Sequence, residues 1–456
     1  MKPLLIFSFL VFITVGRAQD LPNIVFINAD DLTHRDLGCY GGQAHTPNID
    51  RLATEGMRFT HCFQAAPMCS PTRHNIYTGL YPVRSGAYPN HTFAKAGTQS
   101  IVHYLKPLGY RVALSGKTHI APKEVFPFEY SGLGNNPDMA KIDTLMAECV
   151  AENVPFCLFA CSNEPHTPWN KGDAGRYPPE EIVLPPYLVD TPETRDGYSR
   201  YLAEITYYDE QVGQILKLLE KNGLVDNTLV MVTSEQGNGM PFAKWTLYDS
   251  GLQSALIARW PGRIAEGSLT DAMVEYVDVT PTLVDAAGGE PAPGLDGKSF
   301  LPVMLGDSKE HKSHVFGIMT TRGVINHPGH YGIRSVRSRQ FKLIQNLTPE
   351  VEFTNACTKS PEFLSWVLKA DAGDEDAKEK VRRYQRRPAF ELFDVSKDPL
   401  EWTNLAADPE YGPVMEELKV TLAAWMKSQG DMGQETEMAA YEHQKRGKKS
   451  KKDGKK

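Results

Sequence analysis

The sequence predicts an α/β protein in which a large, mostly parallel sheet is flanked by helices and followed by a smaller C-terminal α+β subdomain with an antiparallel sheet. Two observations predict this arrangement. From residue 22 onward, short apolar runs alternate with helical patterns, as in sheets whose parallel strands are joined by crossover helices. Beyond residue 310, paired strand-like segments are followed by a closing helix, which is typical of a separate α+β unit.

Local patterns predict the individual elements. Apolar runs of strand length predict buried strands at residues 23–29, 110–115, 154–161, 228–233 and 255–260. Helical patterns with start and stop signals predict helices at residues 47–55, 100–106, 194–222 and 278–287. In the C-terminal subdomain we expect a hairpin, a further strand and a last helix at residues 331–337 with 340–345, 390–394 and 411–429.

Residues 69–79, Cys-Ser-Pro-Thr-Arg-His-Asn-Ile-Tyr-Thr-Gly, predict a helix with a reactive residue at its N-terminus. Pro71 suits the first turn, and Gly79 suits the C-terminal cap. The N–H groups and dipole of a helix N-terminus favour an anion beside Cys69, and Arg73 adds donors that match tetrahedral oxyanions. The motif therefore suits attack on a sulfuryl or phosphoryl group. The alternative interpretation is a capped surface helix that carries a free thiol.

Polar residues directly follow four of the predicted strands: Asp30 with Asp31, Lys117 with His119, His166, and Glu235 with Gln236. Because ligands of open parallel sheets bind beyond the carboxyl ends of the strands, we expect these side chains to form one site. Adjacent carboxylates repel each other unless a cation or an arginine neutralises them, and their oxygens suit Ca²⁺ or Mg²⁺. A solvated turn is the alternative for the pair Asp30 and Asp31 taken alone.

The start of the chain predicts export. Lys2, the apolar run 4–15 and Ala18 read as a secretory signal peptide spanning residues 1–18. The apolar run is too short to cross a bilayer, so we expect no transmembrane segment and a periplasmic or secreted protein. Residues 19–310 then form the α/β domain and residues 311–430 the C-terminal subdomain.

The charge distribution predicts a basic, disordered tail over residues 431–456. Residues 445–456 hold eight Lys or Arg against one Asp, a local charge of +7, so the net charge of −7 leaves −14 on the rest of the chain. An acidic body argues against a nucleic-acid partner. The spacing of the seven cysteines indicates neither a dense disulfide framework nor a zinc site.

The pattern Cys-x-Pro-x-Arg followed by Thr-Gly resembles the signature of the type I sulfatase family in the alkaline-phosphatase superfamily. The resemblance implies an alkaline-phosphatase-like sandwich fold and conversion of Cys69 to Cα-formylglycine by a formylglycine-generating or equivalent maturation enzyme. The hydrated aldehyde is then the nucleophile. One calcium ion is implied, on the ligands Asp30, Asp31, Cys69, Glu235 and Gln236. The last two depart from the family's Asp-Asn/His by one methylene each, which leaves the identity of the metal open.

The same resemblance implies roles for five further side chains. Lys117 and Lys244 hold sulfate oxygens, and Arg73 orients the nucleophile and offsets developing charge. His119 hydrogen-bonds the hydrated aldehyde or takes its proton, and His166 protonates the leaving group. Without the resemblance, Lys117 and His119 read as ordinary loop residues.

Within the family, residues 116–128, 331–336 and 391–405 are similar to the heparan N-sulfatases (sulfamidases). This implies a sulfated saccharide as substrate, with its sulfate ester or sulfamate on a sugar such as N-sulfoglucosamine, and makes His330 and Arg334 candidates for sugar contacts. Lys244 stands where the sulfamidase pattern has arginine. An O-sulfatase acting on another polysaccharide-derived glycan is the alternative. A phosphatase of the same superfamily and a binding protein that has lost catalysis are more distant ones.

Overall fold

The computed structural model describes residues 21–290, 292–321 and 330–444. The expected signal peptide at residues 1–18 and the lysine-rich segment 445–456 lie outside the described residues. Within the described part, none of the helices combines the length and hydropathy that a membrane span requires. All seven cysteines are free thiols.

The larger of two sheets has nine strands in the order β4-β3-β5-β1-β6-β7-β2-β8, with β9 also paired to β2. Its strands are β1 Asn23–Asn28, β2 Met57–Phe63, β3 Arg111–Gly116, β4 Glu129–Leu133, β5 Phe156–Cys161, β6 Thr228–Thr233, β7 Gln253–Arg259, β8 Ser268–Thr270 and β9 Val274–Glu275. The five strands from β4 to β6 are parallel to one another, while β7 runs antiparallel to both β6 and β2.

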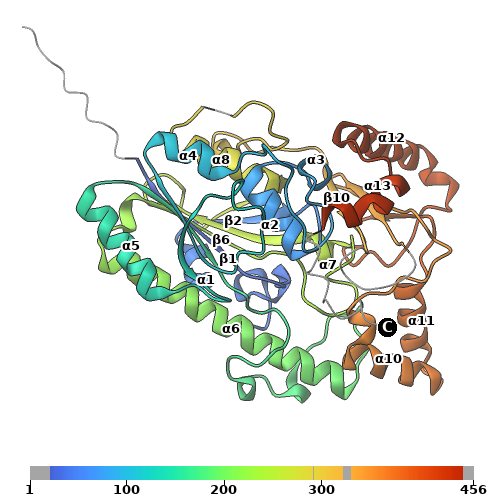
Figure 1. The fold of residues 1–456 in the computed structure, drawn as a ribbon. Coiled ribbons are helices and arrows are strands. Elements are labelled where there is room, and N and C mark those ends of the chain that lie inside the picture. Colours follow the sequence, from blue (N-terminus) through green and yellow to red (C-terminus); the bar gives the residue numbers. More distant parts are fainter. Residues whose placement is uncertain (1–20, 291, 322–329, 445–456) are drawn as a thin grey trace, which may run out of the picture.

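Helices cover both faces of this sheet (Figure 1). One face carries α1 Pro47–Thr54, α5 Met139–Glu152 and α6 Pro192–Lys221, and the other carries α2 Cys69–Thr78, α4 Ile101–Leu105 and α8 Val279–Ala286. Val25 and Ile27 of β1 belong to the first core, and Ile24 and Phe26 belong to the second. A strand buried on both sides has to be apolar throughout, which is why β1 reads as an unbroken apolar run. The predicted sandwich is confirmed.

The smaller sheet is antiparallel, in the order β10-β11-β12-β13. Its strands are β10 Val315–Met319, β11 Ile333–Arg337, β12 Phe341–Asn346 and β13 Phe390–Asp394, and the helices beyond the large sheet are α9 Leu301–Met304, α10 Pro361–Asp371, α11 Glu375–Gln385, α12 Gly412–Gln429 and α13 Gln434–Ala439. The predicted hairpin is confirmed as β11 and β12. The two sheets fall on either side of the expected boundary at residue 310.

A buried ion-pair network joins the two units. Asp249, in the short helix α7 Asp249–Leu252, lies 3.1 Å from Nε of Arg337 and 2.8 Å from Nζ of Lys342. Glu401 adds a second carboxylate 2.9 Å from the same ammonium group. Four buried charges therefore tie the end of the α/β domain to β11 and β12.

The predicted disordered tail begins too early. Residues 431–444 are folded: Asp431 and Glu437 are buried, and α13 packs in the core region next to Tyr88, whose hydroxyl donates to the carbonyl of Thr436 at 2.8 Å. The basic composition starts only at Lys445, so the charge signal does not extend to the helix before it.

Candidate active site

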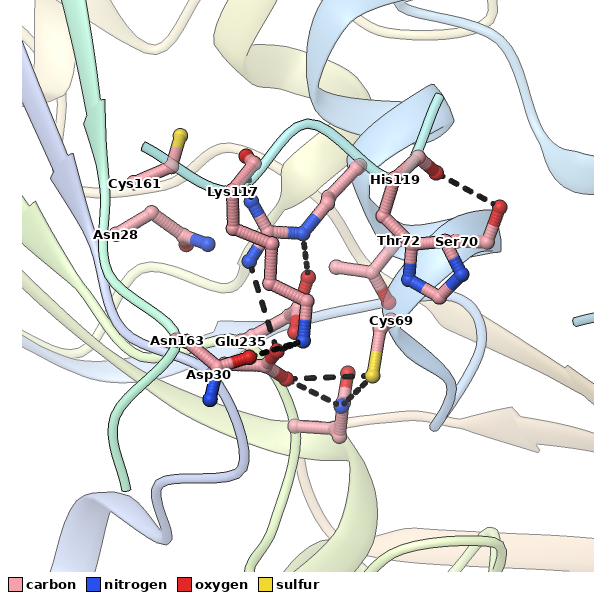
Figure 2. A network of polar contacts seen from close by, with 12 residues as sticks. Asn28, Asp30, Cys69, Ser70, Thr72, Lys117, His119, Cys161, Asn163 and Glu235 are labelled. Atoms are coloured by element: carbon pink, nitrogen blue, oxygen red, sulfur yellow. Dashed lines mark hydrogen bonds and ion pairs between the residues drawn. The ribbon is translucent and has the colours of Figure 1, made fainter. Parts of the chain in front are cut away.

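The strand ends that precede the polar residues lie level with one another. Cys161 of β5 is in register with Gly116 of β3 and with Asn28 of β1, and Asn28 is in register with Thr233 of β6. The segments that follow these four strands therefore emerge side by side at one edge of the sheet (Figure 2). The predicted convergence is confirmed by direct contacts among the side chains.

Helix α2 begins at Cys69 and ends before Gly79, which adopts a left-handed conformation as its cap. Cys69 is 2% exposed, and its Sγ lies 3.2 Å from Oδ1 of Asp30 and 4.0 Å from Oδ1 of Asp31. Burial raises the pKa of the thiol to about 12. The first residue of the helix thus faces the carboxylates that follow β1.

Three buried carboxylates gather at this point. Ligand atoms of Asp30, Asp31, Glu235 and Cys69 all lie within 4.8 Å of one another. Nε2 of Gln236 donates to Oδ1 of Asp31 at 2.6 Å, while its Oε1 is buried without a hydrogen-bond partner among the described residues. Such a set of oxygen donors fits a hard divalent cation, which would offset charges that burial otherwise penalises.

The pKa values of two of these carboxyl groups move in opposite directions. Burial raises the pKa of Glu235 more than its neighbour Arg73 lowers it. Burial also acts to raise the pKa of Asp31, but the charges of Lys244 and His166 outweigh it, so that this pKa is lowered.

Three cationic side chains surround the carboxylates. Arg73 is fully buried, with Nε 2.8 Å from Oε1 of Glu235 and Nη1 donating to the Lys117 carbonyl at 3.0 Å. Nζ of Lys117 donates to Asp30 and, at 3.0 Å, to Oδ1 of Asn163. Burial lowers the pKa of Lys117 to about 8. Arg73 and Lys117 therefore neutralise part of the charge of the carboxylate cluster.

Lys244 joins the cluster from the loop after β6. Its Nζ lies 2.7 Å from Oδ2 of Asp31, 3.4 Å from Sγ of Cys69 and 4.7 Å from the ring centre of Trp245. Burial disfavours the charged amine, but the carboxylate of Asp31 outweighs it and raises the pKa of Lys244. The ammonium group is therefore held charged beside the cysteine.

Two histidines complete the site. Nε2 of His166 lies 3.6 Å from Oδ2 of Asp31; that carboxylate favours the imidazolium, but burial, Lys244 and Lys117 lower the pKa of His166 to about 4. The carbonyl of His119 accepts a hydrogen bond from Oγ of Ser70 at 2.9 Å, which ties His119 to the first turn of α2. Burial and neighbouring cations lower the pKa of His119 to about 2.

A cavity of about 520 Å³ opens from this cluster. Asp31, His166 and Lys244 line one part of it. Other parts of it are lined by Trp169, Arg200, Trp245 and Glu362. Three polar groups of the cluster thus face a space with aromatic and charged walls.

Comparison with known proteins decides the family. Residues 22–289 match the sulfatase family, and residues 237–364 match the family described as N-sulphoglucosamine sulphohydrolase, C-terminal. This chain is a member of the sulfatase family. As such it is a hydrolase of sulfuric esters, and the resemblance drawn from Cys69, Arg73 and Gly79 is confirmed.

Its relatives align along almost the whole sulfatase chain. An ulvan-active sulfatase of Formosa agariphila is 32% identical over 91% of this chain and 82% of its own length. Human N-sulphoglucosamine sulphohydrolase is 28% identical over 91% of this chain and 92% of its own. A protein solved in complex with its substrate D-glucosamine-2-N,6-O-disulfate shares the fold, with a TM-score of 0.68, 22% identity, and coverage of 90% and 98% of the two chains.

Among the predicted site residues of this sulfatase, Arg334 lies outside the active site. It is fully buried in β11, and its guanidinium donates to both carboxylate oxygens of Asp431. The expectation that Arg334 contacts the sugar is therefore corrected: its donors are used within the C-terminal unit. His330 borders residues 322–329, which are not described, and its sugar contact stays a prediction.

Two residues of the sulfatase site were not predicted. Asn163 accepts a hydrogen bond from Lys117, and it is the second residue after β5, so the rule that placed His166 at this edge also applies to it. Nδ1 of His91 lies 2.9 Å from Nε2 of His119, although His91 follows no strand and belongs to no motif. Only the folded chain reveals this second contact.

Proposed function

We propose that this sulfatase hydrolyses the N-sulfate of a glucosamine residue on a saccharide. The observation that carries the proposal is the contact of Sγ of Cys69 with Lys244, at 3.4 Å, and with the carboxylate of Asp31, because both of these partners line the cavity together with His166. The match of residues 237–364 to the N-sulphoglucosamine sulphohydrolase C-terminal family supports this substrate.

We further propose that Cys69 acts as Cα-formylglycine and that Asp30, Asp31, Glu235 and Gln236 hold one Ca²⁺. The hydrated aldehyde supplies two geminal hydroxyl groups, and the cation supplies charge that offsets the sulfuryl oxygens. The buried, partnerless Oε1 of Gln236 and the three crowded carboxylates support this assignment. Glu235 and Gln236 are each one methylene longer than the Asp and Asn of the family pattern, but they still offer an anionic and a neutral oxygen.

The chain's own residues then have distinct tasks. Lys117 and Lys244 bind sulfuryl oxygens, and Arg73 fixes the carboxylates that orient position 69. As the bond from sulfur to nitrogen breaks, His166 delivers a proton to the departing amine. His119 takes the proton of the second hydroxyl, which lets sulfate leave and the aldehyde form again. Water rehydrates it for the next turnover.

Mass spectrometry of the peptide that spans residues 64–73 tests the nucleophile. We expect position 69 to have lost sulfur and gained an aldehyde oxygen in protein from its native host, with Cys62 in a longer digest peptide as the unmodified control. Cys69→Ala is expected to fold normally and to release no sulfate. An unmodified, catalytically competent Cys69 would refute the proposed chemistry.

The ulvan-active relative favours a second candidate, an O-sulfatase that acts on a sulfate ester of another glycan. Ion chromatography of sulfate released from N-sulfated and O-sulfated glucosamine separates the two. The net release of acid, measured in a pH-stat near neutral pH, separates the two reactions independently. Hydrolysis of either group produces one proton together with sulfate. The amine freed from a sulfamate binds that proton, whereas the alcohol freed from an ester does not. Comparing sulfate and phosphate esters of one alcohol tests the phosphatase alternative.

Export and maturation are part of the same proposal. The signal-like start of the sequence supports a periplasmic or secreted enzyme, and the proposed formylglycine requires a maturation enzyme as a partner. Fractionation of the native host, followed by detection of sulfate release in each fraction, tests the location.

A further inference from the structure

A pair of histidines lies at the edge of the site. Nδ1 of His91 is 2.9 Å from Nε2 of His119, and the two ring centres are 4.9 Å apart. His91 is exposed, whereas Nδ1 of His119 is buried and has no hydrogen-bond partner among the described residues. The pair therefore leads from a buried nitrogen to the solvent.

The backbone holds both rings in place. His91 and His119 have φ angles of 55° and 49°, in the left-handed region that non-glycine residues seldom adopt. Three residues beyond His91, the N–H of Ala94 donates to the carbonyl of Ala121 at 2.8 Å, which joins the two segments directly. Two unusual backbone conformations thus bring these imidazoles together.

The C-terminal segment braces the same loop from the other side. Oγ1 of Thr92 donates to the carbonyl of His443 at 2.6 Å, and Nε2 of Gln444 donates to the carbonyl of Asn90 at 2.9 Å. His91 therefore stands between two residues that are both anchored to the end of the described chain. Its position does not depend on its contact with His119.

His119 is equally tied to the nucleophile's helix. Its carbonyl accepts from Oγ of Ser70, the residue after Cys69, which holds the His119 backbone against the first turn of α2 (Figure 2). The free Nδ1 is the ring nitrogen that His91 does not occupy. Nε2 of His119 thus contacts His91, and Nδ1 is left without a partner among the described residues.

The contact with His91 selects a tautomer of His119. A neutral imidazole has one donor nitrogen and one acceptor nitrogen. Burial, and after it the charges of Lys117, Arg73 and Lys244, lower the pKa of His119 and favour the neutral ring. If Nε2–H donates to His91, Nδ1 is an acceptor; the opposite tautomer would place an N–H on buried Nδ1, where the described residues offer it no acceptor.

We propose that His91 is a positioning residue that holds His119 in the Nε2–H tautomer, so that Nδ1 accepts the proton of the second hydroxyl at position 69. The proton leaves the hydroxyl oxygen, whose bonding electrons form the carbonyl as sulfate departs, and it binds Nδ1. His91 continues to accept from Nε2–H of the resulting imidazolium, which returns its Nδ1 proton to water after sulfate leaves. This inference rests on the proposed role of position 69.

His91→Gly is the decisive variant, because glycine adopts a positive φ without strain and loses only the ring. We expect kcat to fall by roughly 10- to 100-fold, the usual cost of removing a partner that orients a reactive histidine, with little change in KM. Because His91 is exposed, added imidazole should enter the vacated space and restore much of the rate. His45→Ala, which removes an exposed histidine elsewhere, is the matched control and should have the wild-type rate.

Nitrogen-15 NMR of histidine-labelled protein tests the tautomer without any turnover. His119, assigned with a His119→Gln variant, should show a protonated Nε2 and an unprotonated Nδ1 in the wild type, and a mixture in His91→Gly. His91→Asn, which also suits a left-handed backbone, repeats the test if the glycine variant fails to fold.

A protonated Nδ1 in the wild type, an unchanged kcat in His91→Gly, or a slow variant that imidazole does not restore would each overturn the proposal. Absence of sulfatase turnover in the wild type would instead count against the proposed function. The NMR result would still decide the role of His91 in that case.

Discussion

Lys244→Met should lower kcat far more than it changes the fold. The substitution keeps an unbranched side chain but removes an ammonium that lies 3.4 Å from Sγ of Cys69, the position of the proposed nucleophile. Loss of one such preorganised donor typically costs about 10²- to 10³-fold in kcat, or about 3–4 kcal/mol. Lys244→Arg keeps the charge and should retain most of the activity.

The same substitution also removes a partner from Asp31. Nζ of Lys244 lies 2.7 Å from this carboxylate. Without it, the remaining partners of Asp31 are Nε2 of His166, at 3.6 Å, and the side-chain amide of Gln236, at 2.6 Å. Breaking a buried pair in this way costs about 3–5 kcal/mol of stability in the absence of a bound cation. Calcium should restore most of that stability, because it would neutralise Asp31, but it should not restore kcat.

Initial rates of sulfate release, measured by ion chromatography, and urea unfolding with and without calcium separate the two effects. Lys106→Met, at an exposed lysine in a different part of the chain, is the control. A Lys244→Met enzyme whose kcat stays close to the wild-type value would refute the view that this ammonium binds the reacting group.

Three further perturbations have defined outcomes. Lys342→Met leaves Asp249 and Glu401 with one cation fewer and should lower the free energy of unfolding by about 3–5 kcal/mol, measured in urea; an unchanged midpoint would contradict the network. Chelation followed by dialysis should abolish sulfate release and lower Tm, and Ca²⁺ should restore both; full activity in chelator would exclude the proposed cation. Burial raises the pKa of Asp36 from 3.8 to about 6, so the folded state prefers the protonated acid, and its contribution to stability is complete below about pH 4 and is lost as the pH rises through about 6. Asp36→Asn should therefore gain stability relative to the wild type between pH 4 and 7 in urea titrations, and a constant difference would refute the assignment.

The sequence was sufficient to predict the edge of the sheet on which the site lies. Strands β1, β3, β5 and β6 are apolar because both of their faces are covered, and each apolar run stops where polar residues begin. This transition marks the carboxyl end of a strand. The helix that begins at Cys69 could be predicted equally well, since Pro71 and Gly79 mark its two ends.

Other elements carried a readable signal that was not assigned. Helix α5 buries Ile142, Leu145, Met146 and Cys149, which recur with the spacing of an amphipathic helix, and Asp138 caps its first turn. Strands β8 and β9 are different: they have three and two residues, too few to show any period.

Pairings between distant segments had no local signal at all. Arg334 reads as an available cation, and only the folding of residues 431–444 shows that Asp431 takes both of its donors. His91 lies 28 residues before His119, and the left-handed backbone that joins them is not encoded by glycine at either position. Sequence periodicity describes neighbours along an element, so contacts of this kind lie beyond it.

The brace on the loop around His91 has a consequence for the order of events during synthesis. Tyr88 and Thr92 have their partners in Thr436 and His443, which are synthesised 348 and 351 residues later. Cys69 is 2% exposed once the fold is complete, so an enzyme that carried out the proposed conversion would have to act while the chain is still open. Shortening the chain before residue 431 should therefore lengthen the period in which Cys69 is accessible, at the expense of the loop that supports His119.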